Sequence, residues 1–330
     1  MGQVLSSFFE SWILPWVEDA FEWKWMRMMD QVKAEDMRLW ETYEYEGVSM
    51  VLDVLPSTLD DLKTLEIRDD DVFIVTYPKA GTTWTQEIMS CILYDGNMEK
   101  INKKHTSRRV PFLEMTVGGT VHKNLPRVHK MIGWMPRSSP RLIKSHLQGQ
   151  LLPPQVWEKK IKIVYVIRNP KDVATSFFHH SQLMNPHLKL DWDDYFDKFH
   201  SGKIGFGRWW DHYLYFWERR NEDNILFLRF EDMKEDLRGT VERISKFLGK
   251  SFSVDVIDAI TDHCTFANMK KNPMTNPDTF INRIFGQQEG RSFMRKGVKG
   301  DWKAHLSESQ SEAIDDLCKD KFAGTGLSFD

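Results

Sequence analysis

Cysteine and long apolar stretches are scarce in this chain of 330 residues. Its three cysteines, Cys91, Cys264 and Cys318, are an odd number, lie far apart and form no CxxC pair, which disfavours a disulfide framework and a zinc site. No apolar run reaches the ~18 residues of a transmembrane helix. The first basic residue is Lys24, so a secretory signal is not predicted either. These absences favour a reducing, intracellular compartment, and we expect a cytoplasmic protein.

An excess of charge of one sign is also missing, because 45 Lys and Arg are balanced by 48 Asp and Glu. The net charge of -3 provides no broad basic surface, so we expect no nucleic acid partner. Any anionic ligand must therefore be held by a local cluster of side chains. The composition, 41% hydrophobic and 28% charged, is that of a globular protein.

The N-terminal residues 1–44 differ in texture from the rest of the chain. Gly2 begins an M-G-x-x-x-[ST] pattern, which is a weak signal for myristoylation. Aromatic and aliphatic residues then recur at helical spacing, with acidic residues between them. Such a helix packs on protein more readily than on anionic lipid, although a myristoylated Gly2 would add a peripheral membrane contact. We expect an amphipathic aromatic extension over residues 1–44 and one domain over residues 45–330.

The clearest unit of the body is a strand, a tight loop and a helix over residues 71–93. The strand is β-branched and aromatic, and apolar residues recur at helical spacing in the helix. A loop of this kind at a helix N-terminus is suited to bind a phosphate-like group. Its polar and flexible residues are Lys79, Gly81, Thr82 and Thr83. It is not a Walker A loop, because no Gly stands five residues earlier and the Lys precedes the Gly.

A second strand, loop and helix follow over residues 162–177. Asn169 suits the N-cap of this helix and Pro170 its first turn. Arg168, at the end of the strand, and Ser176 would face the crevice where parallel sheets bind ligands, although Arg168 could equally form a structural ion pair. Two anion-binding loops of this kind, each between a strand and a helix, imply a ligand with more than one anionic group. The alternation of strands and helices predicts an α/β fold with a parallel sheet.

Three long motifs resemble those of the cytosolic sulfotransferases. They are residues 77–84 (YPKAGTTW), residues 168–173 (RNPKDV) followed by Ser176, and residues 293–297 (FMRKG) followed by 300–303 (GDWK). With weaker matches at 109–114 and 230–234, the resemblance covers about residues 45–327. It implies a single α/β domain whose central parallel sheet is flanked by helices. It also implies a cosubstrate, 3'-phosphoadenosine 5'-phosphosulfate (PAPS), a product, 3'-phosphoadenosine 5'-phosphate (PAP), and no metal.

The resemblance further implies which residues bind the nucleotide. The loop after the first strand would hold the 5'-phosphosulfate, and Arg168, Ser176 and residues 295–297 would hold the 3'-phosphate. Trp84 and Phe266 would flank the adenine. The nucleotide-binding residues implied in this way are Lys79, Ala80, Gly81, Thr82, Thr83, Trp84, Arg168, Ser176, Phe230, Thr265, Phe266, Met269, Phe293, Met294, Arg295, Lys296 and Gly297.

The same resemblance makes His146 the general base, with Lys79, Lys144 and Ser176 as further catalytic residues. The alternation of Leu142, Lys144 and His146 places these side chains on one face of an extended segment. An imidazole near its ordinary pKa can take the proton of an attacking hydroxyl or amine. The lysines would neutralise charge on the transferring group. We therefore expect sulfuryl transfer from PAPS to a hydroxyl or amine of a small lipophilic acceptor.

The acceptor pocket is less well defined by the sequence. Phe112, Met115, Phe177 and Phe178 resemble its apolar lining, but each could equally belong to the core. Residues 272–290 have the polar, Pro- and Gly-punctuated composition of a mobile loop that closes over the ligands.

Several residues depart from the family pattern. Ala80 stands where a Ser is usual, Phe230 replaces a Tyr, and Cys264 replaces a Thr that would touch the base. Each change predicts the loss of one hydrogen bond to the nucleotide, worth about 0.5–1.5 kcal/mol. Ser307 and Glu308 alter the family's dimer motif, and a carboxylate in a dimer contact is costly unless it is paired. The usual homodimer is therefore not expected.

Two other functions stay open at this point. A phosphoryl-transfer enzyme of P-loop-like architecture is disfavoured by the missing Walker A spacing. A nucleotide-binding scaffold without activity is disfavoured because Lys79, Lys144, His146 and Ser176 are all present.

Overall fold

The computed structural model describes residues 40–329 except 117–126, 134, 136–139 and 188. The predicted aromatic extension, including Gly2, therefore lies outside the described residues up to position 39. The described chain begins with Trp40 and a hairpin of two strands, whose first strand spans the expected boundary between residues 44 and 45. No helix in the described part is long and apolar enough to cross a membrane.

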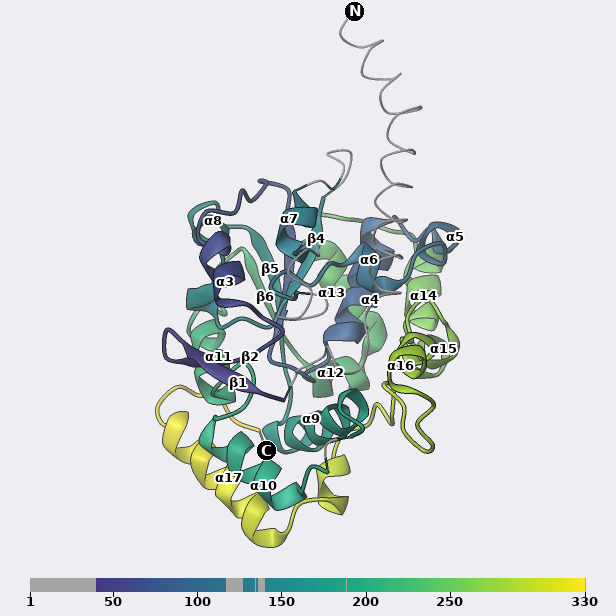
Figure 1. The fold of residues 1–330 in the computed structure, drawn as a ribbon. Helices are drawn as coiled ribbons and strands as arrows, with labels where there is room; N and C mark the ends of the chain where they lie inside the picture. The colour runs from purple at the N-terminus through teal and green to yellow at the C-terminus, as the bar shows by residue number, and fades with distance from the viewer. Residues whose placement is uncertain (1–39, 117–126, 134, 136–139, 188, 330) are drawn as a thin grey trace, which may run out of the picture.

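A four-stranded parallel sheet forms the centre of the molecule (Figure 1). Its strand order is β4-β3-β5-β6. The strands are β3 (Val72–Thr76), β4 (Leu142–Ser145), β5 (Lys162–Ile167) and β6 (Ile225–Arg229). The two central strands are buried almost throughout, which explains their continuous apolar sequences. The predicted α/β fold with a central parallel sheet is confirmed.

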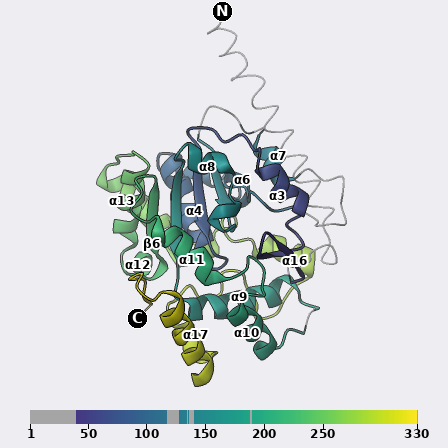
Figure 2. The same cartoon turned by 90° about the vertical axis from the view of Figure 1, so that its left-hand side faces the viewer.

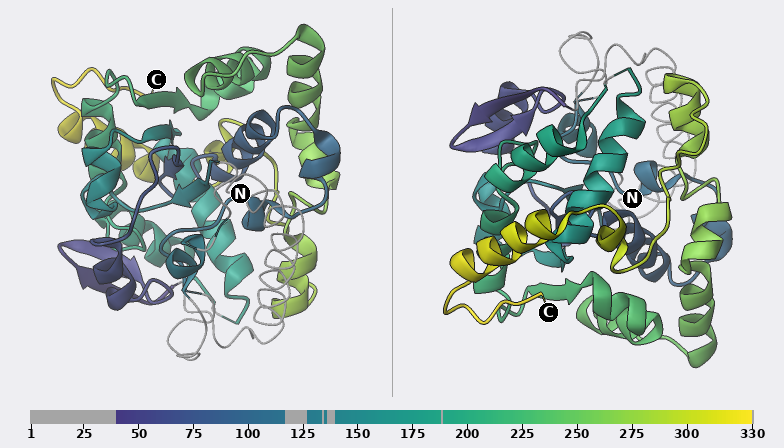
Figure 3. Two further views of the ribbon diagram at one scale, coloured as in Figure 1. Left: turned by 90° about the horizontal axis from the view of Figure 1, so that it is seen from above. Right: turned by 90° about the horizontal axis from the view of Figure 1, so that it is seen from below.

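Helices cover both faces of the sheet. Phe73 and Val75 face one apolar core, whereas Val72 and Ile74 face the other. The first core contains α9 (Pro170–Met184), α10 (Trp192–Ser201), α11 (Trp209–Glu218) and α17 (Glu308–Lys321). The second contains α4 (Thr82–Leu93), α13 (Leu237–Phe247) and α14 (Val254–His263). The view from below in Figure 3 shows α17 lying across this first helical layer.

The remaining elements complete the edges of the domain. The short helix α12 lies beside the edge strand β6, next to α13 (Figure 2). The elements at the edges of the domain are β1 (Thr42–Tyr45), β2 (Val48–Val51), α3 (Pro56–Leu62), α5 (Met98–Ile101), α6 (Thr106–Arg109), α7 (Val128–Ile132), η3 (Gly149–Leu151), α8 (Pro154–Glu158), α12 (Phe230–Glu235), α15 (Phe266–Lys271), α16 (Asp278–Phe285) and η4 (Asp301–Ala304). Residues 272–290, expected to be a loop, contain the two-turn helix α16, whose Ile281 is buried.

The strand order creates a crevice at the carboxyl ends of β3 and β5. The chain leaves β3 toward β4 on one side, and β5 is followed by β6 on the other, so the connections diverge between these two strands. A divergence of this kind is where open α/β sheets bind ligands. Asn169 caps α9 by accepting the backbone N–H of Lys171 at 3.0 Å, and Pro170 occupies the first turn, as predicted.

A buried ion pair ties the beginnings of β3 and β4 together. The Nε of Arg141 donates to Asp71 Oδ1 at 2.6 Å, and a second guanidinium nitrogen donates to Oδ2. The same guanidinium donates to the carbonyl of Ile132 at 3.1 Å. Asp71 in turn accepts the backbone N–H of Arg68 at 2.8 Å. The pair is therefore fully satisfied although both side chains are almost inaccessible to water.

Replacement of Asp71 by Ala leaves Arg141 buried without its counter-ion. We expect this variant to lose about 3–5 kcal/mol of unfolding free energy, measured by urea denaturation. Asp69→Ala is the matched control, because this carboxylate is 90% exposed and forms a surface ion pair with Lys159. Its effect should stay within about 0.5 kcal/mol. Equal losses in the two variants would contradict a structural role for the buried pair.

Candidate active site

A cavity of about 350 Å³ opens at the carboxyl ends of β3, β4 and β5. This volume suits a small-molecule ligand. It brings together most of the predicted site residues, from segments far apart in the chain. These are Lys79, Gly81, Thr82, Thr83, Trp84, Phe112, Met115, Lys144, His146, Arg168, Ser176, Phe177, Phe230, Phe266, Met269, Phe293, Met294, Arg295, Lys296 and Gly297.

The loop between β3 and α4 is held in an unusual backbone conformation. Lys79 has a φ of 70° and Gly81 a φ of 116°. A Cβ at position 81 would also lie 3.0 Å from the ring of Phe230. Only glycine combines this φ with such a close approach. The non-glycine Lys79 in the left-handed region is a strained residue at the ligand site, which is where such strain is usually found.

Two lysines face the cavity without an ion-pair partner among the described residues. Lys79 Nζ lies 4.4 Å from the centre of the Phe293 ring, and Lys144 Nζ lies 4.0 Å from the centre of the Phe112 ring. Burial, with repulsion from Lys144 and nearby guanidinium groups, lowers the pKa of Lys79 to about 7. Burial lowers the pKa of Lys144 to about 8, against the opposite effect of the Glu114 carboxylate. Both ammonium groups are thus under-solvated and would be stabilised by an anion.

His146 follows β4 and points one ring nitrogen into the sheet. Its Nδ1 lies 2.7 Å from the carbonyl oxygen of Thr76, which can only accept. The proton therefore resides on Nδ1, and Nε2 carries the free lone pair. The backbone N–H of His146 donates to Glu114 Oε1 at 2.6 Å, which fixes the position of the residue.

The surroundings of His146 change its expected acidity. Burial and the charge of Lys144 hold its pKa well below the usual range for histidine, so the predicted near-ordinary pKa is wrong. At neutral pH the imidazole is uncharged and able to accept a proton. Its ring is held edge-on by Phe112 at 4.9 Å and Phe206 at 5.4 Å. Phe206 itself has a φ of 71°, so backbone strain accompanies this clamp.

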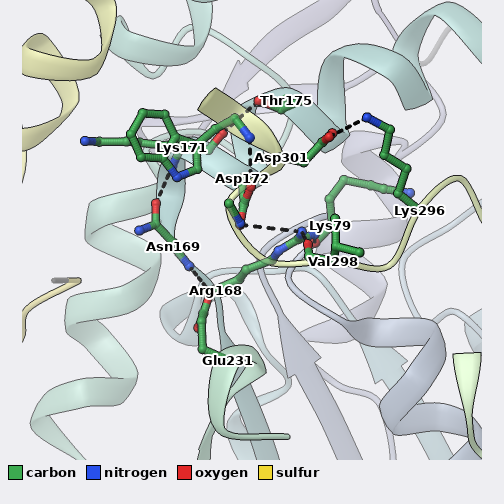
Figure 4. Close-up of polar contacts among 12 residues, drawn as sticks. Lys79, Arg168, Asn169, Lys171, Asp172, Thr175, Glu231, Lys296, Val298 and Asp301 are labelled. Carbon is green, nitrogen blue, oxygen red and sulfur yellow. Dashed lines mark hydrogen bonds and ion pairs between the residues drawn. The ribbon is translucent and has the colours of Figure 1, made fainter. Parts of the chain in front are cut away.

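Arg168 directly follows β5 and lines the cavity. Figure 4 shows its side chain beside Lys79, Asp172 and Val298. Its guanidinium donates to the carbonyl of Val298 at 2.8 Å and to that of Lys79 at 3.4 Å. Asp172, one turn later, lies 3.8 Å away, so the structural ion pair left open above is loose. The Nε of Arg168 is buried and has no hydrogen-bond partner among the described residues. The guanidinium therefore connects the loop that contains Lys79 with the segment that contains Val298. Its Nε–H is still available to donate a hydrogen bond to a ligand.

The segment from Arg295 to Asp301 forms the opposite wall. Lys296 pairs with Asp301 Oδ1 at 2.6 Å, and Arg295 pairs with the other carboxylate oxygen. Asp172 fixes the segment by accepting the backbone N–H groups of Gly300 at 2.7 Å and Trp302 at 3.1 Å. The Asp301 carboxylate thus holds the side chains of Arg295 and Lys296 close together.

Aromatic side chains line a slot beside these cations. The Trp84 and Phe230 rings meet edge to face at 5.5 Å, and the Trp84 indole donates to the carbonyl of Cys264 at 2.7 Å. A Cβ at Gly297 would come within 2.2 Å of the Phe266 ring, so this glycine lets the ring approach the segment. Flat apolar walls next to several cations suit a planar, anionic ligand.

The profile of the Sulfotransferase domain family matches residues 69–326. The chain belongs to the sulfotransferase family. Human Sulfotransferase 1C2 is 40% identical over 280 residues, which cover 83% of this chain and 91% of that protein. The amine sulfotransferase of rabbit, Oryctolagus cuniculus, is 41% identical over 276 residues, covering 82% of this chain and 87% of that protein. The predicted sulfotransferase is confirmed at the level of the family.

Two solved structures share the fold. Retinol dehydratase in complex with androsterone and inactive cofactor PAP superposes with a TM-score of 0.81 and 26% identity, covering 92% of this chain and 95% of that one. The mouse sulfotransferase SULT7A1 complexed with PAP gives a TM-score of 0.67 and 27% identity, covering 86% of this chain and 95% of that one.

Four residues singled out in the sequence lie outside the cavity of this sulfotransferase. Ala80, in the loop between β3 and α4, is fully buried, and Thr265 caps α15 by accepting the backbone N–H of Asn268. Phe178 packs into the helical layer on the far side of α9. The Cys264 side chain is buried and does not line the cavity, and its backbone carbonyl accepts the indole N–H of Trp84. The loss of a hydrogen bond to the base at this position stays a prediction.

Several lining residues were not anticipated. They are Val51, Pro78, His180, Ser181, Met184, Phe206, Lys234, Val298 and Asp301. His180, Ser181 and Met184 lie on the cavity face of α9, one and two turns after Ser176. Helical periodicity counted from Ser176 would have predicted them. Asp301 lies within the GDWK motif at residues 300–303, and Val298 lies between that motif and the FMRKG motif. No local signal marks Val51 or Phe206, which reach the site through tertiary packing.

A cluster of polar groups behind α4 is separate from the cavity lining. Ligand-type atoms of Glu87, Cys91 and His263 lie within 4.8 Å of one another. The Glu87 carboxylate is already bound by Arg109 at 2.6 Å, Thr106 at 2.7 Å and His263 at 2.8 Å. These contacts hold the pKa of Glu87 low, at about 2, against the effect of burial. The cluster is accounted for as a buried network between helices.

Proposed function

We propose that this sulfotransferase transfers the sulfuryl group of PAPS to a hydroxyl or amine of a small lipophilic acceptor. One observation carries the proposal. A single cavity is lined by a neutral His146 with a free Nε2 and by Lys79 and Lys144, which form no salt bridge among the described residues. A neutral base next to two ammonium groups that form no salt bridge fits the transfer of an anionic group to a protic acceptor.

The donor fits the residues present. The lysines and the buried Arg168 Nε offer donors that no protein group uses in the described chain. The loop at the N-terminus of α4 would hold the phosphosulfate end, with Lys79, Thr82 and Thr83. Arg168, Ser176, Arg295 and Lys296 would hold the 3'-phosphate, and Trp84 with Phe266 would flank the adenine. The PAP bound to retinol dehydratase and to the mouse enzyme supports this assignment.

His146 would act on the acceptor. Its Nε2 takes the proton of the acceptor hydroxyl or amine as that atom forms a bond to sulfur. The bond between sulfur and the phosphate oxygen breaks, and PAP leaves with the electron pair. Lys79 and Lys144 stabilise the charge that grows on the oxygen being released. The low pKa of His146 keeps it in the proton-accepting form before each cycle.

The other roles remain predictions. Phe112, Met115 and Phe177 would form the apolar wall of the acceptor site. Membrane contact through Gly2 and the absence of the usual homodimer stay untested. The structure gives the altered dimer residues a local role, because Ser307 forms a capping box with Gln310 and Glu308 lies in the first turn of α17, where a carboxylate is favoured.

Replacement of His146 by Ala removes the proposed base and leaves the cations in place. We expect kcat to fall by about 10²–10⁴-fold, measured as sulfuryl transfer from PAPS to phenol, while PAP still binds in calorimetry. His200→Ala, outside the cavity on α10, is the control and should leave the rate unchanged. A His146→Ala enzyme with more than about a tenth of the wild-type rate would contradict the general-base role.

Nucleotide binding should depend on pH through the two lysines. Free Lys79 and Lys144 lose their protons near pH 7 and 8, whereas bound phosphate oxygens would raise both pKa values. Binding of PAP should therefore take up protons. As the pH rises from 7 to 9.5, the affinity for PAP should fall by up to about tenfold per pH unit for each lysine. Calorimetry in buffers of different ionisation enthalpy measures this uptake. Proton release, or affinity that is constant over this range, would show that the lysines do not contact the ligand.

A further inference from the structure

The imidazole of His180 lines the cavity but has no role in the proposed sulfuryl transfer. It lies on α9, one turn after Ser176, and lines the same cavity as His146. It has no hydrogen-bond or ion-pair partner in the described part of the chain, whereas Nδ1 of His146 is tied to Thr76. An imidazole that faces a cavity with unused polar atoms is available to a ligand.

The neighbours of His180 locate it between the two halves of the cavity. Its ring meets Phe177, of the proposed acceptor wall, at 6.4 Å, and Phe293 at 5.7 Å. Phe293 is also the ring over which the Lys79 ammonium lies. His180 therefore lies where an acceptor bound against Phe177 would approach the transferring group.

The charge state of His180 follows from these surroundings. Burial, and the charges of Lys79 and Lys144, hold its pKa well below the usual range, and His146 acts in the same direction. At neutral pH the ring is uncharged, with one N–H donor and one acceptor nitrogen. Such a ring pairs well with a neutral hydroxyl, which can both donate and accept. A protonated amine is disfavoured at this point by the nearby lysines.

Resting on the proposed function, we propose that His180 binds a second polar group of the acceptor, so that the enzyme prefers aromatic compounds with two hydroxyl groups over those with one. One hydroxyl would give its proton to His146, and the other would hydrogen-bond with His180. The apolar side chains of Phe112 and Phe177 would contact the ring between them. His180 is in this account a specificity-determining residue and takes no part in the transfer itself.

The test compares phenol with catechol, resorcinol and hydroquinone as acceptors. In the wild type we expect the best diol to exceed phenol in kcat/KM by about tenfold, mainly through KM. His180→Phe should remove most of this preference and change kcat/KM for phenol by less than about threefold. His180→Gln, which keeps a donor and an acceptor, should retain at least half of the preference on a logarithmic scale. Comparison of the diol-to-phenol ratio between wild type and variant cancels differences in intrinsic acceptor reactivity.

The outcomes separate this inference from the proposed function. If wild-type enzyme binds PAP and sulfates phenol and the diols, but the diol-to-phenol ratio is the same in His180→Phe, the role of His180 is overturned and the proposed function stands. If the ratio falls equally in the Phe and Gln variants, packing alone matters and the hydrogen bond is overturned. If the wild type sulfates none of the four compounds, the proposed function fails and this inference fails with it. PAP-induced thermal stabilisation of both variants confirms that they are folded.

Discussion

The burial of several cations in one cavity is the constraint on which the rest of this site depends. Lys79, Lys144 and Arg168 come from the carboxyl ends of three adjacent parallel strands, and their mutual repulsion adds to the loss of hydration. Neither lysine forms a salt bridge in the described structure, although the charge of the buried Glu114 carboxylate acts on Lys144. Such an arrangement opposes folding of the empty protein and favours an anionic ligand by the same interaction. The surrounding apolar core has to supply the stability that the site does not.

The positions of these cations are set by features of the backbone. Lys79 and Phe206 adopt left-handed conformations that side chains other than glycine rarely take, and both reside in the cavity wall. Gly81 and Gly297 allow aromatic rings to approach the chain more closely than any Cβ would permit. Asp172 then holds the segment that carries Arg295 and Lys296 against the start of α9. Strain and close packing are thus concentrated where the ligand is expected to bind.

Much of this architecture could be predicted from the sequence because it rests on local signals. Continuous apolar runs indicated β3 and β5, and Asn169-Pro170 indicated the start of α9. The motifs after these strands placed Lys79 and Arg168 at one sheet edge, since parallel strands end at the same edge.

The sequence predictions that were wrong or missing have physical causes in tertiary packing, which local sequence patterns do not reveal. Phe177 and Phe178 are adjacent on a helix, so about 100° separates them, and only the first faces the cavity; the second packs on Trp192 at 4.9 Å. The low pKa of His146 depends on burial and on Lys144, which only the assembled site shows. Residues 272–290 are polar, yet their Ile281 finds a buried place that stabilises α16. Phe206 reaches the site from a distant segment.

The most direct test of the account is thermal unfolding of the full-length protein alone and with saturating PAP, 5'-AMP or ATP. A ligand at a hundred times its dissociation constant adds about 2.7 kcal/mol, which corresponds to a shift of several degrees in a chain of this size. The account predicts a large shift with PAP and a much smaller one with 5'-AMP or ATP, since only PAP carries phosphates at both the 3' and 5' positions. Equal shifts with ATP, or no shift with PAP, would contradict the assignment of the buried cations to a 3',5'-bisphosphate.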